Sequence, residues 1–163
     1  MTENTDQKQP EQPFALQINA QYIKDLSFEA PGMPQALFSL TQAPEIKISV
    51  DVKASKQNEQ DRYNVDLEIK VQADTAQENK TLFLCELVYG GFVTLKAPQS
   101  HIEPLLLIEI PHLLFPYARS IIGNLVREAG FPSLQINPID FAALYRARLA
   151  QQQKNQPKTE GET

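Results

Sequence analysis

Residues 82–92 read LFLCELVYGGF, and this stretch decides the predicted fold. Its odd positions from Phe83 to Tyr89 are apolar, and its even positions are apolar as well, apart from Glu86. Successive side chains of a strand point to opposite faces, so this strand is predicted to be covered on both faces. Gly90 and Gly91 interrupt it and predict a bulge or a close approach of two backbones.

Three further strands are predicted before this one. Residues 46–52 and 63–73 alternate between apolar and polar side chains, a pattern typical of strands with one buried and one wet face. Polar turns at 53–61 and 74–79 predict consecutive antiparallel pairing, a meander. Residues 14–28 carry apolar side chains mainly at even positions and predict a long first strand, with a bulge or bend near Lys24, where Ile23 faces the other way.

Two helices are predicted after the strands. Pro111 suits the first turn of a helix whose apolar stripe runs from Leu114 to Ala129, with Gly130 as its C-terminal cap. Pro116 requires the first turn as well, or else a start nearer residue 115. Asn137 as N-cap and Pro138 as the first helical residue open a second helix. The predicted class is therefore α+β, a four-stranded antiparallel sheet followed by two helices.

Length and composition predict one domain. The chain has 163 residues, 42% of them hydrophobic, so residues 14–150 form a single core, while the polar residues 1–13 and 151–163 are predicted to be disordered tails. The formal charge of −5 argues against nucleic acid as a partner. No apolar run reaches the roughly 18 residues of a membrane span, and the polar start lacks a signal peptide, so no membrane insertion is expected. The single cysteine, Cys85, suits a reducing compartment.

The residue pattern offers little for catalysis. Neither His101 nor His112 has a second histidine at helical metal-ligand spacing, and no phosphate-binding glycine pattern is present. We therefore predict no metal, no cofactor and no enzyme activity. An enzyme remains the competing class, because titratable groups can converge in space. Asp25 and Glu29 present two anions on the face opposite their apolar neighbours.

Four segments together resemble the SecB family of protein-export chaperones. They read YIKDLSFEAP (22–31), FLCELVYGGF (83–92) and LFPYAR (114–119), followed by FPSL (131–134) with NPIDF (137–141). The resemblance covers about residues 14–149. It implies a cytoplasmic homotetramer, a dimer of dimers whose sheets sandwich the helices. It also implies an ATP-independent chaperone that binds unfolded secretory precursors, keeps them competent for translocation and delivers them to the SecA motor.

The resemblance also assigns surfaces. In the family, acidic and apolar residues on the outer sheet face dock SecA, and the matching positions are Asp25, Glu29, Leu84 and Glu86. Client binding needs an adaptable apolar groove, for which the apolar connections and the second helix provide candidates: Leu37, Phe38, Leu40, Leu105, Leu106, Leu107, Ile108, Ile110, Phe141 and Leu144. Ordinary core or subunit interface is the alternative for these residues. The alternative function is a SecB-like chaperone for another client, such as a toxin-antitoxin pair.

Overall fold

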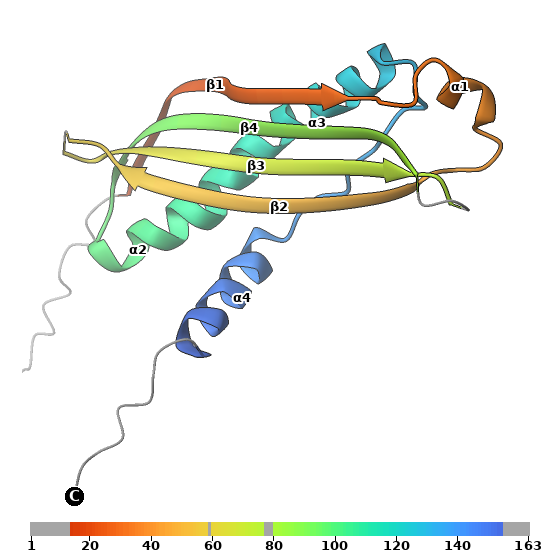
Figure 1. Ribbon diagram of the computed structural model, residues 1–163. Coiled ribbons are helices and arrows are strands. Elements are labelled where there is room, and N and C mark those ends of the chain that lie inside the picture. Colours follow the sequence, from red (N-terminus) through yellow and green to blue (C-terminus); the bar gives the residue numbers. More distant parts are fainter. Residues whose placement is uncertain (1–13, 59, 77–79, 155–163) are drawn as a thin grey trace, which may run out of the picture.

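The computed structural model describes residues 14–154 except 59 and 77–79, so the predicted tail at 1–13 and most of that at 151–163 lie outside the described residues. Strands come first and helices follow (Figure 1). The elements are β1 (Ala15–Glu29), α1 (Gln35–Ser39), β2 (Glu45–Lys56), β3 (Arg62–Asp74), β4 (Thr81–Lys96), α2 (Gln99–Pro104), the π-helical turn η1 (Leu105–Glu109), α3 (Ile110–Glu128) and α4 (Phe141–Lys154). The α+β class and the four-stranded antiparallel sheet are confirmed.

The strand order is β1-β4-β3-β2. The predicted meander of β2, β3 and β4 is therefore confirmed, and β1 joins it beside β4 at the far edge. The connection from β1 to β2 crosses the end of the sheet and contains α1 (Figure 1). β4 is an interior strand between β1 and β3. The prediction that both of its faces are covered is wrong, because the outward-facing Leu84, Glu86 and Val88 are only half-buried, whereas the odd positions from Phe83 to Tyr89 are buried.

Two bulges in β1 change which face its side chains occupy. The register against β4 shifts between Ile18 and Ala20 and again between Ile23 and Asp25. The predicted irregularity near Lys24 is confirmed. A single apolar face along the even positions is wrong, because Tyr22 pairs with Gly90 on the outer face while Leu26 pairs with Leu87 on the helix side. Each bulge adds one residue and so reverses the alternation.

Gly90 and Gly91 do not interrupt β4, which continues to Lys96. The predicted close approach of two backbones is not what the structure shows, because side chains lie over both glycines. A Cβ on Gly90 would lie 2.5 Å from the Tyr22 ring, and a Cβ on Gly91 would lie 3.1 Å from a methyl carbon of Leu114 in α3. The glycine pair therefore makes room for the Tyr22 ring on one face of β4 and for the Leu114 side chain on the other.

The helical segment is longer than predicted, because α2, η1 and α3 follow one another from Gln99 to Glu128. The predicted position of Pro111 in a first helical turn is confirmed. Ile110 N–H bonds the Leu105 carbonyl in a π-turn, and Pro111 then occupies the first turn of α3, where its missing N–H costs little. Pro116 lies inside α3 rather than at its start. Gly130, with φ +87°, ends α3 as predicted, and its N–H donates to the Arg127 carbonyl.

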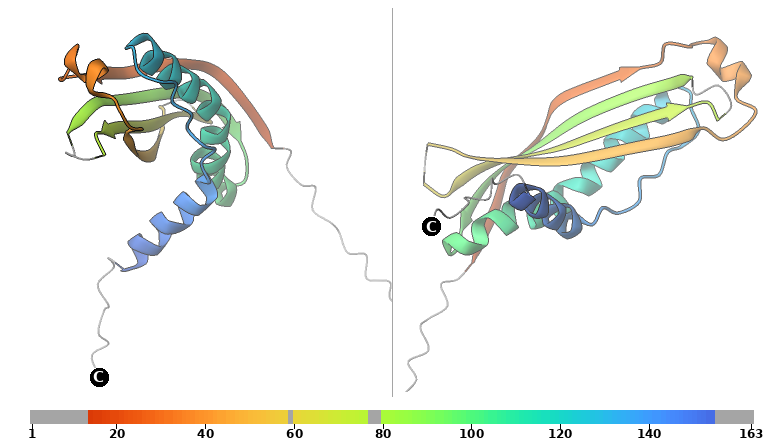
Figure 2. Two further views of the ribbon diagram at one scale, coloured as in Figure 1. Left: turned by 90° about the vertical axis from the view of Figure 1, so that its right-hand side faces the viewer. Right: turned by 60° about the horizontal axis from the view of Figure 1, so that its bottom comes forward.

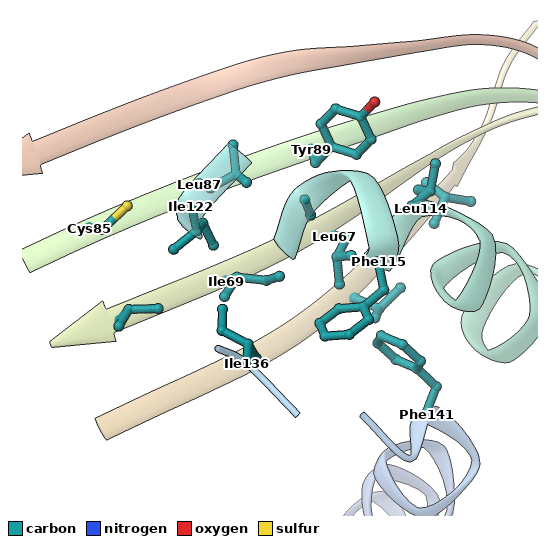
Figure 3. Close-up of a cluster of buried hydrophobic side chains, with 14 of the residues drawn as sticks. Leu67, Ile69, Cys85, Leu87, Tyr89, Leu114, Phe115, Ile122, Ile136 and Phe141 are labelled. Carbon is teal, nitrogen blue, oxygen red and sulfur yellow. The ribbon is translucent and has the colours of Figure 1, made fainter. Parts of the chain in front are cut away.

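The core lies between the sheet and α3, on one face of the sheet (Figures 2 and 3). Ile110, Leu114, Ala118, Ile122 and Val126 recur every four residues and are 0% exposed. The helical stretch 99–128 is long and apolar enough to cross a membrane by composition, because an 18-residue window within it has a mean hydropathy of 1.4. Their buried stripe packs against β3 and β4, which is typical of the core helix of a globular domain.

α4 follows a 12-residue connection and packs through its first turn. Its N-cap is Asp140, whose Oδ1 accepts the Ala143 N–H at 2.8 Å, so the predicted start at Asn137 and Pro138 is wrong. Phe141 is fully buried and stacks edge-on against Phe115 of α3. The helix runs to Lys154, four residues beyond the predicted domain end at 150.

Candidate functional site: the uncovered face of the sheet

The outer face of the sheet carries no helix within the described residues, because α2, α3 and α4 all lie on the opposite side (Figure 2). The four predicted docking residues gather on this outer face. Glu29 pairs directly with Leu84, Ser27 pairs with Glu86, and Asp25 pairs with Val88. Asp25 and Glu29 are four residues apart on β1, a span of about 13 Å. We call Asp25, Glu29, Leu84 and Glu86 the outer patch.

Glu86 has a partner that sequence reasoning missed. Its Oε1 lies 2.7 Å from Lys70 Nζ on β3, and its side chain is 46% exposed. Lys70 and Glu86 are direct neighbours across the β3–β4 pair, so the carboxylate of Glu86 is compensated by a cation. Leu84 is half-buried and extends the patch with apolar surface.

Lysines elsewhere on this face are also paired. Three ion pairs join Lys24 to Asp66, Lys47 to Asp74 and Lys53 to Glu68. The hydrogen bonds to these carboxylates raise the pKa of all three lysines. Asp25 and Glu29 are exposed and have no ion pair within the described part of the chain. Within the described residues, the outer-face carboxylates without an ion pair therefore lie on the two edge strands, Asp25 and Glu29 on β1 and Glu45 and Asp51 on β2.

The predicted client residues separate into buried and accessible groups. Leu106, Leu107, Ile110 and Phe141 are between 0% and 8% exposed, so they belong mainly to the core. Burial leaves Ile110 and Phe141 no surface for a client, so the interpretation of these two as a groove lining is wrong. Leu106 and Leu107 keep a small accessible surface that lines hollows beside α4. Leu37 and Phe38 are 41% and 86% exposed on α1. Half-buried positions make up the rest: Leu40, Leu105, Ile108 and Leu144.

A hollow of about 370 Å³ opens beside α1, between the β1–β2 crossover and the start of β4. Ala36, Leu40 and Leu82 contribute apolar walls, and Thr75 and Lys80 contribute polar groups. The hollow thus joins one predicted client residue, Leu40, to positions that the sequence pattern did not single out.

A second apolar surface on the helix side was also missed. Ile23 and Leu26 on β1 and Leu113 and Tyr117 on α3 are between 37% and 54% exposed. Tyr117 stacks on Tyr89, with ring centroids 6.5 Å apart, which joins the α3 positions to the sheet. The signal was present in the sequence, because Leu113 and Tyr117 are four residues apart and begin a second apolar stripe on α3. We call Ile23, Leu26, Leu113 and Tyr117 the side patch.

The described residues contain no group of three or more potential metal ligands. His101 Nδ1 lies 3.1 Å from Ser100 Oγ on the exposed helix α2, and no hydrogen bond joins it to Glu103 in the described structure. Burial raises the pKa of the Cys85 thiol to about 11, so thiolate chemistry is disfavoured. The geometry therefore presents surfaces for binding rather than a catalytic centre.

Comparison with known proteins gives one family. Residues 7–152 match the family model described as preprotein translocase subunit SecB. The protein-export protein SecB of Granulibacter bethesdensis is 45% identical over 94% of both chains. That of Bartonella quintana is 48% identical over 85% of this chain and 86% of its own. That of Paramagnetospirillum magneticum is 44% identical over 93% and 97%.

A solved structure supports the fold. The SecB-like chaperone of Mycobacterium tuberculosis, in complex with a peptide from an antitoxin, superposes with a TM-score of 0.65 at 10% identity. The superposition covers 76% of this chain and 90% of that one. An identity this low shows a shared fold only. The match along residues 7–152 and the 44 to 48% identities establish more: this chain belongs to the SecB family of protein-export chaperones, which are not enzymes.

Proposed function

We propose that this protein is a cytoplasmic, ATP-independent homotetramer that holds unfolded secretory precursors and delivers them to SecA. The outer patch carries the proposal, because it combines two carboxylates without ion pairs and a half-buried leucine on a face that no helix covers. An acidic patch of this kind attracts a basic partner segment and orients it, which affects encounter and specificity more than raw affinity. The proposed docking residues are Asp25, Glu29, Leu84 and Glu86.

Charge reversal tests the docking proposal. The double variant Asp25→Lys with Glu29→Lys is expected to weaken SecA binding about tenfold at low salt, and less at high salt because exposed charges are screened. Isothermal titration calorimetry measures the affinity. Glu45→Lys is the matched control, since Glu45 is also exposed and lies on the distant strand β2. Equal SecA affinity for the double variant and the control would refute docking at the outer patch.

The side patch supports the proposed oligomer. A monomer of this size rarely leaves a contiguous apolar surface of several large side chains in water. β1 is an edge strand, and the helix-side residues Ile23 and Leu26 on it lie beside the apolar stripe of α3 that begins at Leu113. A second copy would cover both elements and form a dimer, and the proposed dimer of dimers joins two such dimers through a further interface. Sedimentation should therefore give four times the chain mass, and Tyr117→Asp should lower that mass.

The accessible apolar residues of α1 and the crossover are the proposed client contacts. Phe38 is the most exposed large hydrophobic residue described, at 86%. Leu37, Leu40, Leu105, Ile108 and Leu144 complete the accessible part of the predicted set. Wild-type protein should slow the refolding of a secretory precursor, and Phe38→Ser should weaken that effect. Unchanged refolding with excess wild-type protein, together with a monomeric mass, would defeat the chaperone assignment for this chain.

A further inference from the structure

Glu86 lies between two neighbours of different chemistry on the outer face. Its partner on β1 is Ser27, and its partner on β3 is Lys70. Asp25 and Glu29 occupy the same face, two residues to either side of Ser27. Diagonal neighbours in an antiparallel pair are about 7 to 8 Å apart, so both carboxylates lie at about that distance from Glu86. Three carboxylates thus surround Ser27, and a cation lies behind one of them.

The Glu86 side chain points toward this cation and away from β1. Its Oε1 lies 2.7 Å from Lys70 Nζ. Repulsion by Asp25 and Glu29 favours the same direction, because charges less than about 10 Å apart are only partly screened at physiological salt. Lys70 therefore neutralises the carboxylate that lies between the other two along the strands, and we say that it masks Glu86.

Exposed contacts rather than packing hold the masking pair together. The Lys70 and Glu86 side chains are 48% and 46% exposed. Exposed ion pairs contribute little to stability, because water solvates the two separated ions well and holding two long side chains in one geometry costs entropy. A cation from a binding partner can therefore replace Lys70 at Glu86 with little loss of free energy.

Lys70 also has negative groups on its other side. Glu68 lies two residues earlier on the same face of β3, and Asp51 is the partner of Glu68 on β2. Glu68 binds Lys53, with Oε1 2.6 Å from Nζ, whereas Asp51 has no ion pair in the part of the chain that the structure describes. Lysine carries its charge on a flexible four-carbon stem, so a displaced Lys70 stays close to negative charge. Displacement from Glu86 therefore does not leave the ammonium group isolated.

We propose that Lys70 tunes the docking of SecA by masking Glu86 in the free protein, and that a lysine or arginine of SecA replaces Lys70 at Glu86 in the complex. This inference rests on the proposed docking at the outer patch and adds a positioning residue to it. The exchange makes docking weaker than it would be with three unmasked carboxylates, because the loss of the old ion pair offsets the gain of the new one. A contact of this strength reverses readily, which suits a protein that has to separate from its partner after delivery.

Three lysine substitutions test the masking. Lys70→Gln unmasks Glu86 and is expected to tighten SecA binding about fivefold in calorimetry at low salt, which corresponds to one exposed ion pair. Lys70→Arg keeps the cation and should bind SecA as the wild type does. Lys53→Gln is the matched control, because it also removes one positive charge and breaks an exposed pair on this face, but on the distant strand β2. Its SecA affinity should change less than about twofold.

A double-mutant cycle separates masking from a general change in net charge. Removing any positive charge from this face strengthens its attraction for a basic partner, whether or not Glu86 is present. Masking acts only through Glu86. Lys70→Gln should therefore tighten SecA binding about fivefold in the wild-type background but less than about twofold in the Glu86→Gln background. Circular dichroism and sedimentation check that each variant keeps the wild-type fold and mass.

Two results would overturn the masking. Equal tightening by Lys70→Gln with and without Glu86 would show that only net charge matters, and so would equal affinities for Lys70→Gln and Lys53→Gln. In either case the docking proposal stands if the double variant Asp25→Lys with Glu29→Lys still weakens SecA binding. If that double variant binds SecA as tightly as the wild type, docking at the outer patch fails, and the masking fails with it.

Discussion

Gly90 and Gly91 are neighbours in β4, but alanine is expected to act differently at the two positions. A Cβ at residue 91 would lie 3.1 and 3.2 Å from the two methyl carbons of Leu114, and Leu114 is 0% exposed in the centre of the core. A Cβ at residue 90 would lie 2.5 Å from the Tyr22 ring. Tyr22 is 36% exposed on the outer face, so its ring can turn aside into solvent.

The size of the effect follows from these contacts. Carbon atoms pack best about 3.5 to 4.0 Å apart, so alanine at residue 91 has to push α3 outward by several tenths of an ångström. Overpacking of a dense core costs about 1 to 3 kcal/mol. Removing a flexible glycine from a strand returns about 0.5 to 1 kcal/mol. We expect Gly91→Ala to lower the free energy of unfolding by about 1 to 2 kcal/mol and Gly90→Ala to change it by about 0.5 kcal/mol or less.

Urea unfolding at one fixed protein concentration measures both values, because oligomer formation contributes to apparent stability. A double-mutant cycle isolates the contact. In the Leu114→Ala background the space beside residue 91 is open, so Gly91→Ala should there be neutral or stabilising. Equal destabilisation at residues 90 and 91, or the same cost of Gly91→Ala in both backgrounds, would refute the reasoning.

Three further outcomes follow from single groups. Hydrogen bonds from Gln72 and two other side chains hold the pKa of Asp74 below its usual range. The ionised carboxylate therefore stabilises the folded state fully above the unfolded pKa, and this contribution is lost as the pH falls through the folded pKa. Asp74→Asn should make the free energy of unfolding, measured with urea, depend less on pH below about pH 4. Cys85 is buried, and burial raises its pKa to about 11. Its thiol should therefore react with a thiol reagent at pH 8 only as fast as the protein unfolds. Rapid reaction of the native protein would contradict this burial. Asp140→Ala should remove the cap on the Ala143 N–H and destabilise α4 by about 1 kcal/mol, seen as faster amide exchange confined to that helix.

The sheet was predictable where one face of each strand is buried. β3 alternates because its even positions face water and its odd positions from Tyr63 to Ala73 are buried, so periodicity alone locates it. β1 was not fully predictable, because it is an edge strand and its two bulges add residues at points that no residue type marks. Because of the first bulge, Tyr22 faces outward and Ile23 faces the helices, which reverses the predicted arrangement.

The start of the long helix was missed because prolines were interpreted as boundaries. A π-turn before Pro111 shifts the hydrogen-bond register, so that the chain passes from η1 to α3 without a break.

Composition also does not separate a core helix from a groove wall. Phe141 and Ile110 are as apolar as Phe38, but the first two are 0% exposed and the third is 86% exposed.

The candidate site followed from sequence only in part. The positions Asp25, Glu29, Leu84 and Glu86 came from the family resemblance, and the register places them on one uncovered face. The partner of Glu86 depends on the pairing of β3 with β4, which places Lys70 opposite it.

The central claim is that the motor and the client use different faces of this protein, the outer patch and the helix side. The most direct measurement is a calorimetric titration of SecA into the protein already saturated with an unfolded precursor. We predict a ternary complex in which SecA binds the loaded protein at least as tightly as the free protein, with Asp25→Lys and Glu29→Lys weakening both equally. Displacement of the precursor by SecA, or loss of SecA binding upon loading, would contradict separate faces.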